Sequence, residues 1–363
     1  MRLLVLSPTL EVAGAERIAV DLARHVATRG HDVALVAPPG PLEDELAAAG
    51  IARLHVAGLG RSPLGVATAA VSVARAIRAR RPTVVHAHNP RMAAVARTAR
   101  LLAGGGPPLL TTFHGGRVEG DRAAARLLRS GDRLVCVDDD LRDRMVAHGC
   151  AADRTEVILN GVGPALAPDD PLLAGLDAEL GRDGPTVAVV GSLVAVKAVD
   201  RAIRATRLVI DAVPTARLLV VGDGPERTAL EALATSLGLG AHVRFLGVRR
   251  DARAVVQRAT VVVSTSRSEG LSLAALETLR AGTPLVAPDV GGMRRLLGGG
   301  AGVLLADTRP PTVAAAVVDL LRRPDVVAAM GRAGRALTAD RHDRDRMLAA
   351  YESAYLGLSG AVR

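Results

Sequence analysis

An alternation of short apolar runs with longer segments of helical spacing constrains this chain's fold more than any other feature. In the first half, two of the longer segments, residues 14–28 and 63–80, are expected to be helices. We expect strands at the Val- and Leu-rich runs, residues 3–7, 32–37, 83–88, 109–113 and 133–137. Short aliphatic strands between helices are typical of a parallel sheet that helices cover on both faces.

The alternation stops at residues 162–185, which are rich in Pro, Gly and Asp, and then starts again. Such composition indicates a connection between domains. We expect further strands at residues 186–190, 218–221, 243–246, 260–264, 285–287 and 303–305, followed by two closing helices near 311–322 and 341–358. The sequence therefore predicts an α/β protein of two doubly wound, Rossmann-like domains, residues 1–165 and 184–340, facing a central cleft where ligands bind.

Composition excludes several other classes of protein. Aromatic residues make up 1% of the chain and Trp is absent, so we expect no nucleic-acid partner, because such partners stack on aromatic side chains. The net charge of +9 comes from Arg residues interspersed with acidic ones. Cys136 and Cys150 lack the spacing of a zinc site or a disulfide framework. The apolar start is too short for a signal peptide and no run is long enough to span a membrane, so a cytoplasmic location is expected.

Lys197 is the only lysine among 46 basic residues. It follows Gly191-Ser192-Leu193, which comes directly after the first predicted strand of the second domain. Where Arg is used almost everywhere else, a single lysine beside a strand end suggests a need for a compact ammonium group, such as contact with a phosphate oxygen. The alternative is a surface lysine without a role.

The most specific local pattern places Glu269 and Glu277 on either side of a predicted helix start near Ser272. Glu277 falls in an otherwise apolar helical stretch, where a carboxylate is costly unless it is paired or accepts hydrogen bonds from hydroxyl groups. Sugar hydroxyls would satisfy both carboxylate oxygens. The helix start offers unpaired N–H groups to a phosphate, and so does the start near Gly14. The alternative is that both glutamates are simply solvated.

His114 ends a first-domain strand before a pair of glycines, which favours a functional role over a structural one. His86 and His88 share one face of another strand, but two histidines without a third ligand do not make a credible metal site. The triplet Asp138-Asp139-Asp140 follows a strand and precedes a helical segment, so we expect it to cap a helix rather than bind a metal.

Together these residues resemble the family 4 retaining glycosyltransferases, which have the two-domain GT-B fold. The resemblance covers nearly the whole chain. It is carried by segments 13–17, 112–114, 157–162, 191–197, 221–226 and 243–247 and by the Glu-x7-Glu element that runs from Glu269 to Glu277.

The resemblance implies a role for each matching residue of the second domain. Lys197 would bind the donor phosphate, next to Ser192. Glu269 would hold hydroxyls of the donor sugar, and Glu277 would hold the ribose. Backbone amides of Gly270-Leu271-Ser272 would cradle the pyrophosphate. The family often has Arg where Ser192 stands, which would leave more of the phosphate charge to Lys197.

In the first domain, the resemblance implies that amides at Gly14 contact the pyrophosphate and that His114 contacts the donor sugar beside the reacting carbon. The nucleotide base would lie near residues 247–250, and the final helix, residues 341–363, would cross back onto the first domain. Such enzymes need no metal or other cofactor. Ala198 replaces a glycine that is common after the lysine.

The resemblance implies transfer of a hexosyl-type sugar from a UDP- or GDP-sugar to an acceptor hydroxyl with retention. A nucleotide-sugar epimerase of the same fold and a non-catalytic nucleotide-sugar binding protein are the alternatives. The acceptor is left open between a small molecule and a lipid-linked one. Residues 66–81 could form a basic amphipathic helix that touches the inner face of a membrane, although an ordinary helix covering the sheet is favoured.

Overall fold

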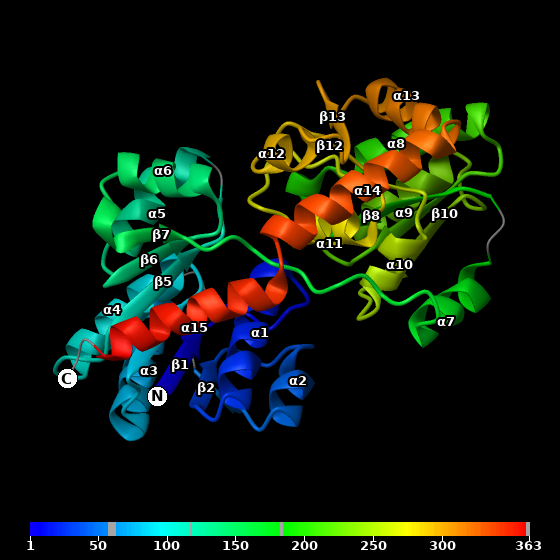
Figure 1. Cartoon of the computed structure of the whole chain (residues 1–363). Helices are drawn as coiled ribbons and strands as arrows, with labels where there is room; N and C mark the ends of the chain where they lie inside the picture. The colour runs from blue at the N-terminus through cyan, green and yellow to red at the C-terminus, as the bar shows by residue number, and fades with distance from the viewer. Residues whose placement is uncertain (57–62, 117, 182–183, 361–363) are drawn as a thin grey trace. The chain divides into compact units, whose positions relative to one another are not determined.

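The computed structural model describes residues 1–56, 63–116, 118–181 and 184–360. Arg182 and Asp183 of the predicted connection and residues 361–363 of the predicted final helix lie outside the described residues. The chain divides into two compact units. One contains Met1–Asn160 and the segment from Asp345 onward, and the other contains Gly161–Arg344. Each unit is built around one parallel sheet (Figure 1), so the prediction of two doubly wound domains is confirmed.

The sheet of the first unit has seven strands in the order β3-β2-β1-β4-β5-β6-β7. From β1, the chain first adds β2 and β3 on one side of the sheet. It then continues on the other side of β1, where β4 to β7 follow in order. Such a reversal point places a crevice at the carboxyl ends of the strands on either side of it. The strands are β1 (Arg2–Leu6), β2 (Asp32–Val36), β3 (Ala52–Leu54), β4 (Val84–Ala87), β5 (Leu109–Phe113), β6 (Arg133–Cys136) and β7 (Thr155–Val157).

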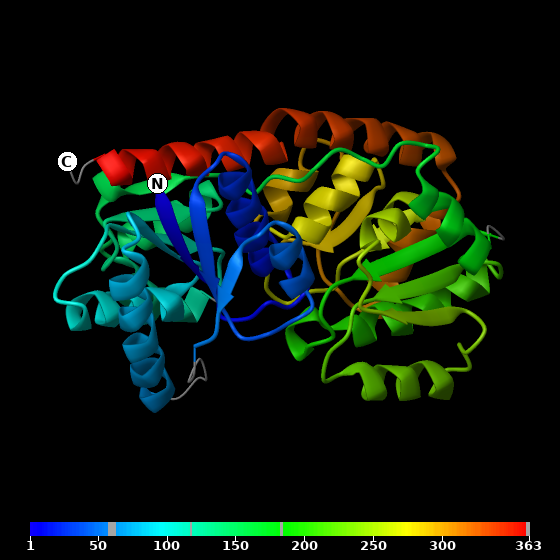
Figure 2. The same ribbon diagram turned by 90° about the horizontal axis from the view of Figure 1, so that it is seen from below.

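Helices cover both faces of this sheet because its central strands are apolar on both sides; Leu3 to Leu6, for example, are all buried. Figure 2 shows α15 along one face and α3 and α4 along the other. The helices are α1 (Gly14–Thr28), α2 (Glu43–Ala48), α3 (Pro63–Arg80), α4 (Pro90–Leu102), α5 (Asp121–Leu128), α6 (Asp139–Ala147) and α15 (Arg344–Gly360), with short 3₁₀ turns η1 (Val118–Gly120) and η2 (Ala152–Arg154). Among the described residues, no helix is both long and apolar enough to cross a membrane.

The second unit repeats the plan with six parallel strands in the order β10-β9-β8-β11-β12-β13, and its reversal lies between β8 and β11. The strands are β8 (Thr186–Val190), β9 (Arg217–Val221), β10 (Val243–Gly247), β11 (Val261–Val263), β12 (Leu285–Pro288) and β13 (Gly302–Leu305). The helices are α7 (Pro171–Leu180), α8 (Val199–Ala212), α9 (Arg227–Ser236), α10 (Ala252–Arg258), α11 (Leu273–Ala281), α12 (Met293–Leu297), α13 (Pro310–Leu321) and α14 (Pro324–Arg341), with the 3₁₀ turn η3 (Ala195–Lys197).

Helix α7 forms within the predicted connection, residues 162–185, with Pro171 at its first turn and Asp170 as its N-cap. One expectation about the chain's organisation was wrong. The end of the chain contains three helices rather than two, because α14 lies between α13 and α15. The expected cap at Asp138 is confirmed, since its carboxylate accepts a hydrogen bond from the Asp140 N–H at the start of α6.

The chain enters and leaves the second unit through two adjacent segments. The Val162 N–H donates to the His342 carbonyl oxygen over 2.8 Å, and the Arg344 N–H donates to the Val162 carbonyl oxygen over 3.2 Å. Gly161 permits this approach, because a Cβ there would lie 2.4 Å from the Asp343 carbonyl oxygen. The two ends of the second unit are therefore hydrogen-bonded side by side.

Helix α14 packs against α11 through glycines rather than through large side chains. Gly331 and Gly334 are buried, and a Cβ at Gly331 would lie 2.2 Å from the Gly282 carbonyl oxygen. The helix backbone therefore lies almost in contact with the loop that follows α11. Such a close approach leaves no room for a methyl group.

Gly331→Ala should accordingly destabilise the second unit by roughly 1–3 kcal/mol, because the methyl group must displace backbone atoms. Gly357→Ala is the matched control, since Gly357 is an exposed glycine of α15 where a Cβ would meet nothing within 4 Å. It should instead raise stability by about 0.5–1 kcal/mol through the better helix propensity of Ala. Urea unfolding monitored by circular dichroism would measure both changes, and equal stabilities would contradict the packing argument.

Candidate active site

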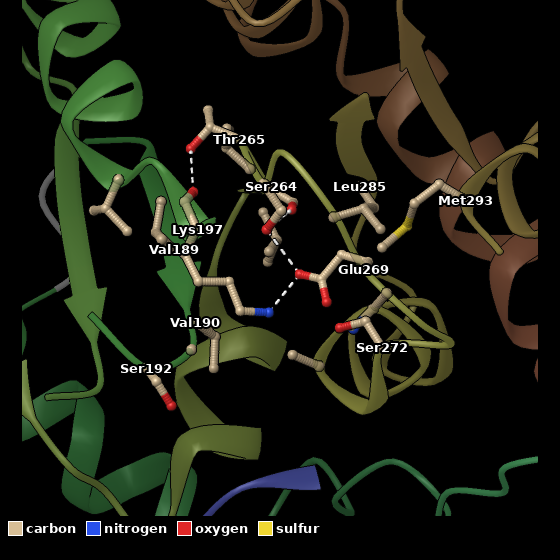
Figure 3. A pocket seen from close by; sticks show the side chains of 17 residues that line it. Val189, Val190, Ser192, Lys197, Ser264, Thr265, Glu269, Ser272, Leu285 and Met293 are labelled. Carbon is tan, nitrogen blue, oxygen red and sulfur yellow. Dashed lines mark hydrogen bonds and ion pairs between the residues drawn. The ribbon is translucent and has the colours of Figure 1, made fainter. Parts of the chain in front are cut away.

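Lys197 and Glu269 meet at the reversal point of the second sheet. Lys197 ends the turn η3 that follows β8, and Glu269 lies in the loop between β11 and α11. The Lys197 Nζ donates to Glu269 Oε1, and Ser266 Oγ donates to the same oxygen over 2.7 Å (Figure 3). The side chains of Lys197 and Glu269 are only 26% and 11% exposed. The pair is therefore largely shielded from solvent and holds one carboxylate oxygen in a fixed position.

Further hydrogen bonds join the two loops that carry this pair. Thr265 Oγ1 donates to the Ala198 carbonyl oxygen over 2.8 Å, and the Arg267 N–H donates to the Val196 carbonyl oxygen over 2.8 Å. Ala198 has φ 48° and ψ 43°, the left-handed conformation that glycine adopts without a steric penalty. This conformation explains why a glycine is common at this position in the family. With alanine in its place, the loop carries a small backbone strain.

A third loop supports Glu269 from the other side. A Cβ at Gly291, which has φ 56°, would lie 2.4 Å from the Glu269 carbonyl oxygen and 2.7 Å from that of Gly270. The segment after β12 can therefore approach the Glu269 loop closely only because residue 291 is glycine. Three loops after adjacent strands thus fix one carboxylate and one ammonium group.

These groups line a pocket whose walls are partly apolar and partly polar. Ser192, Lys197, Glu269 and Ser272 line it, so the structure brings four of the residues predicted from the sequence together. The remaining lining residues include Gly191, Val190, Ser264, Ser266, Leu285 and Met293. Ser266 is a site residue that the sequence analysis missed, although its position three residues before Glu269 was a usable signal.

The start of α11 adds hydrogen-bond donors to this pocket. Ser272 is its N-cap, with Oγ accepting from the Ala275 N–H over 3.4 Å, so the helix axis begins at the pocket wall. The positive end of a helix dipole at this place favours an anion. Gly270 and Leu271 precede the cap and do not line the pocket, and Leu271 is buried. Glu277 is half-buried within α11 and is also not among the lining residues.

His114 and Gly14 belong to the first unit. Gly14 is exposed at the start of α1, after the N-cap residue Ala13. Glu16 in the same first turn accepts a hydrogen bond from Thr9 Oγ1 over 2.8 Å. This helix start therefore already carries a carboxylate, which offsets part of the dipole's attraction for an anion.

His114 follows β5 and is part of a polar cluster in the apolar interior. His114 Nε2 lies 3.2 Å from His88 Nδ1, and the two rings are stacked with an interplanar angle of 14°. Burial lowers the pKa of His114 to about 4 and holds the pKa values of His86 and His88 well below the usual 6.5. All three rings are therefore neutral at physiological pH.

The C-terminal helix completes this cluster. His86 Nδ1 lies 2.7 Å from the Tyr355 hydroxyl, and its Nε2 lies 2.7 Å from Thr112 Oγ1. Thr112 Oγ1 lies in turn 3.3 Å from the Tyr351 hydroxyl. This partnership was not predicted from the sequence, although the only two tyrosines of the chain, Tyr351 and Tyr355, are four residues apart. Tyr355 and Thr112 thus occupy both ring nitrogens of His86. The described residues contain no group of three or more possible metal ligands.

Two family models match the chain in succession. The model described as Glycosyltransferase Family 4 matches residues 12–166, and the model described as Glycosyl transferases group 1 matches residues 177–337. The D-inositol 3-phosphate glycosyltransferase of Acidothermus cellulolyticus is 30% identical over 367 aligned positions, which cover 89% of this chain and 81% of that protein. The chain therefore belongs to the family 4 glycosyltransferases.

Other relatives match over a smaller part of their length. The D-inositol 3-phosphate glycosyltransferase of Frankia alni is 33% identical over 238 positions, 61% of this chain and 58% of that protein. Among solved structures, Anabaena HepE in complex with UDP and glucose has a TM-score of 0.84 at 21% identity and covers 98% of this chain and 100% of its own. Sucrose-phosphate synthase from Thermosynechococcus elongatus has a TM-score of 0.83 at 19% identity, with 99% and 100% covered. These likenesses confirm the expected GT-B fold.

The buried histidines predict a pH dependence of stability. Their pKa values are lowered in the native state, so between about pH 6.5 and pH 4 the unfolded chain binds more protons than the native one. Their contribution to stability is fully present above pH 6.5 and is lost as the pH falls toward 4. His86 and His88 each contribute a slope of up to about 1.4 kcal/mol per pH unit, and half-buried His114 contributes less.

Urea unfolding at intervals from pH 7 to pH 5 would measure this slope. His114→Gln should reduce it, because one of the titrating groups is removed. His148→Gln, which removes an exposed histidine at the end of α6, should leave the slope of the wild type unchanged. A stability that is constant over this range would show that the histidine cluster accepts protons without unfolding.

Proposed function

We propose that this chain transfers a hexosyl-type sugar from a nucleoside diphosphate donor to an acceptor hydroxyl, with retention of configuration at the anomeric carbon and without a metal ion. The observation that carries the proposal is the joint placement of Lys197, Glu269 and the start of α11 in one pocket. An ammonium group and a helix start suit a pyrophosphate, while a fixed carboxylate suits sugar hydroxyls. A nucleotide sugar contains both kinds of group in one molecule.

The Lys197–Glu269 pair indicates how such a donor would bind. Without a ligand, Lys197 is neutralised by Glu269, so a phosphate oxygen must take over part of the ammonium group's hydrogen bonding. Ser266 remains hydrogen-bonded to Oε1 of Glu269 and keeps the carboxylate in place during this exchange. Oε2 is the oxygen that we assign to the sugar hydroxyls. Donor binding would therefore replace part of the Lys197–Glu269 ion pair by a contact between Lys197 and the phosphate and a contact between Glu269 and the sugar hydroxyls.

The other assigned roles rest on the family resemblance. Glu277 would hold the ribose, and Ser192 with the amides of residues 270–272 would contact the pyrophosphate. Gly14 would add amide contacts from the first unit, and His114 would contact the donor sugar. The bond between the anomeric carbon and the phosphate oxygen breaks while the acceptor oxygen bonds to the same face. The departing phosphate takes the acceptor proton, and Lys197 stabilises the charge that develops on it.

The relatives suggest which substrates to test first. UDP and glucose are bound to the Anabaena protein, and the relatives from Acidothermus and Frankia are named for D-inositol 3-phosphate. We therefore propose a UDP-sugar as the first donor and an inositol phosphate as the first acceptor, with GDP-sugars and other hydroxyl acceptors as the next choices.

Most of the expected apolar face of α3 is covered within the first unit, although Leu64 and Val71 of the same helix are exposed. Of the four residues at helical spacing on that face, Ala70, Val73 and Ile77 are buried and Val66 is half-buried, and α3 packs along α4. This is the arrangement of a helix that covers a sheet, with Arg78 and Arg80 near its C-terminus, where the dipole favours cations. We therefore propose a small-molecule acceptor before a lipid-linked one.

The overall activity can be tested with UDP-glucose and inositol 3-phosphate, with and without EDTA. Nuclear magnetic resonance of the product should show the α configuration of the donor, and the rate with EDTA should equal the rate without it, because Lys197 and α11 neutralise the pyrophosphate. Nucleotide release that depends on the acceptor distinguishes transfer from epimerisation. Loss of activity with EDTA that Mg²⁺ or Mn²⁺ restores would contradict the metal-independent mechanism.

Substitutions of the ion pair should separate nucleotide binding from transfer. Lys197→Met keeps the side-chain length without the charge and should weaken UDP binding and lower kcat by about 10²-fold. Glu269→Gln removes the charge that competes for Lys197, so it should bind UDP at least as tightly as the wild type while losing transfer.

Titration calorimetry with UDP and kinetics with UDP-glucose would measure the two effects. Arg294→Ala is the control, because the Arg294 side chain is 73% exposed and does not line the pocket. If Glu269→Gln weakened UDP binding as much as Lys197→Met, the division of roles within the pair would be wrong.

A further inference from the structure

His88 lies beside the proposed sugar-contacting residue His114 and has one unused nitrogen. It follows β4, is 1% exposed, and places Nδ1 3.2 Å from His114 Nε2. Its Nε2 is buried and has no hydrogen-bond partner among the described residues. A buried polar atom without a partner is rare and requires a physical reason.

The contact between the two rings requires that one nitrogen carries the proton and the other does not. If His88 Nδ1 donates, then His88 Nε2 is a bare lone pair and His114 carries its own proton on Nδ1. If His114 Nε2 donates, then His88 must carry its proton on the buried Nε2, and His114 Nδ1 becomes an acceptor. Neutral imidazole has no third arrangement that makes this hydrogen bond.

The unpartnered Nε2 decides between the two arrangements. A buried N–H without an acceptor is rarer in proteins than a buried acceptor without a donor. The first arrangement leaves only a lone pair unsatisfied, whereas the second buries an unused N–H group. The first arrangement is therefore lower in free energy.

The surrounding rings hold His88 in the orientation that this contact needs. The centroid of the His88 ring lies 3.9 Å from that of the His86 ring and 5.5 Å from that of the His114 ring. His86 cannot reorient to serve as the missing partner, because Tyr355 and Thr112 already occupy both of its nitrogens. The anchored His86 ring thus limits the movement of His88.

We propose that His88 is a positioning residue that donates its Nδ1–H to His114 Nε2 and thereby fixes the proton of His114 on Nδ1. His114 then presents a neutral N–H donor rather than an acceptor. If the proposed function is correct, that donor faces an oxygen of the donor sugar. The assignment of the tautomer itself rests only on the contacts within the first unit.

The tautomers can be observed directly by ¹⁵N nuclear magnetic resonance of the histidine rings at pH 7. In the wild-type protein, both His88 and His114 should show a protonated Nδ1 and an unprotonated Nε2. His88→Phe keeps a ring without nitrogen and should leave His114 as a mixture of tautomers. His88→Asn retains an amide N–H near the Nδ1 position and should largely restore the Nδ1–H form of His114.

Kinetics should follow the same order. His88→Phe should lower kcat about three- to tenfold, as expected for the loss of one hydrogen bond, while UDP affinity stays unchanged because neither His88 nor His114 is assigned a contact with UDP. His88→Asn should recover most of the rate. Tyr351→Phe is the matched control, because it removes a hydroxyl group from the same cluster without removing a partner of His86. It should leave the His114 tautomer and kcat near those of the wild type.

An Nε2–H form of His114 in the wild type would overturn the proposal, and so would an unchanged tautomer in His88→Phe. A uniform loss of activity in His88→Phe, His88→Asn and Tyr351→Phe would also overturn it, because the cluster would then act only through stability. The resonance measurement does not depend on transfer. If the wild type shows the Nδ1–H form but transfers no sugar, the proposed function fails while the tautomer assignment stands.

Discussion

The contact between Lys197 and Glu269 joins loops that are 72 residues apart in the sequence, and the arrangement of the pocket depends on it. In a parallel sheet, all strand ends that precede helices lie along one edge, so residues that follow β8 and β11 become neighbours at the reversal point. Partly shielded opposite charges at that edge attract each other more strongly than charges in water. Hydrogen bonds from Ser266 and Thr265, together with the absence of a side chain at Gly291, then fix the loops around the pair.

Much of the framework could be predicted from the sequence because the strands are continuous aliphatic runs. The expected bounds of β5 and β8, for example, agree with those in the structure. Helix α14 could not be recognised in the same way, since three of its buried positions are Gly331, Gly334 and Thr338, which give no apolar stripe. β3 and β7 were also missed, because their three residues include the charged Arg53 and Glu156, whereas the equally short β11 is a continuous Val run.

The polar residues that line the pocket could be predicted more readily than the contacts between them. The uniqueness of Lys197 and the buried context of the Glu-x7-Glu element were visible in the sequence, but the sequence did not indicate that Lys197 and Glu269 neutralise each other. The pair His86 and His88 illustrates the same limit. The two-residue spacing predicted that both rings lie on one face of a strand. The partners of His86 are Thr112 of β5 and Tyr355 of α15, which is 269 residues away in the sequence, and the partner of His88 is His114, just after β5. Such pairings depend on tertiary structure alone.

The position of α15 has a consequence for how this chain is made. Tyr351 and Tyr355 are fully buried in the first unit, yet they follow the whole of the second unit in the sequence. The second unit, by contrast, is contiguous from Gly161 to Arg344 and has its whole core available before α15 appears. Domains generally fold as units during synthesis, beginning with the N-terminal one. In this chain the order of completion is reversed, because the first unit must wait for α15, which is synthesised after the second unit, before its histidine cluster can close.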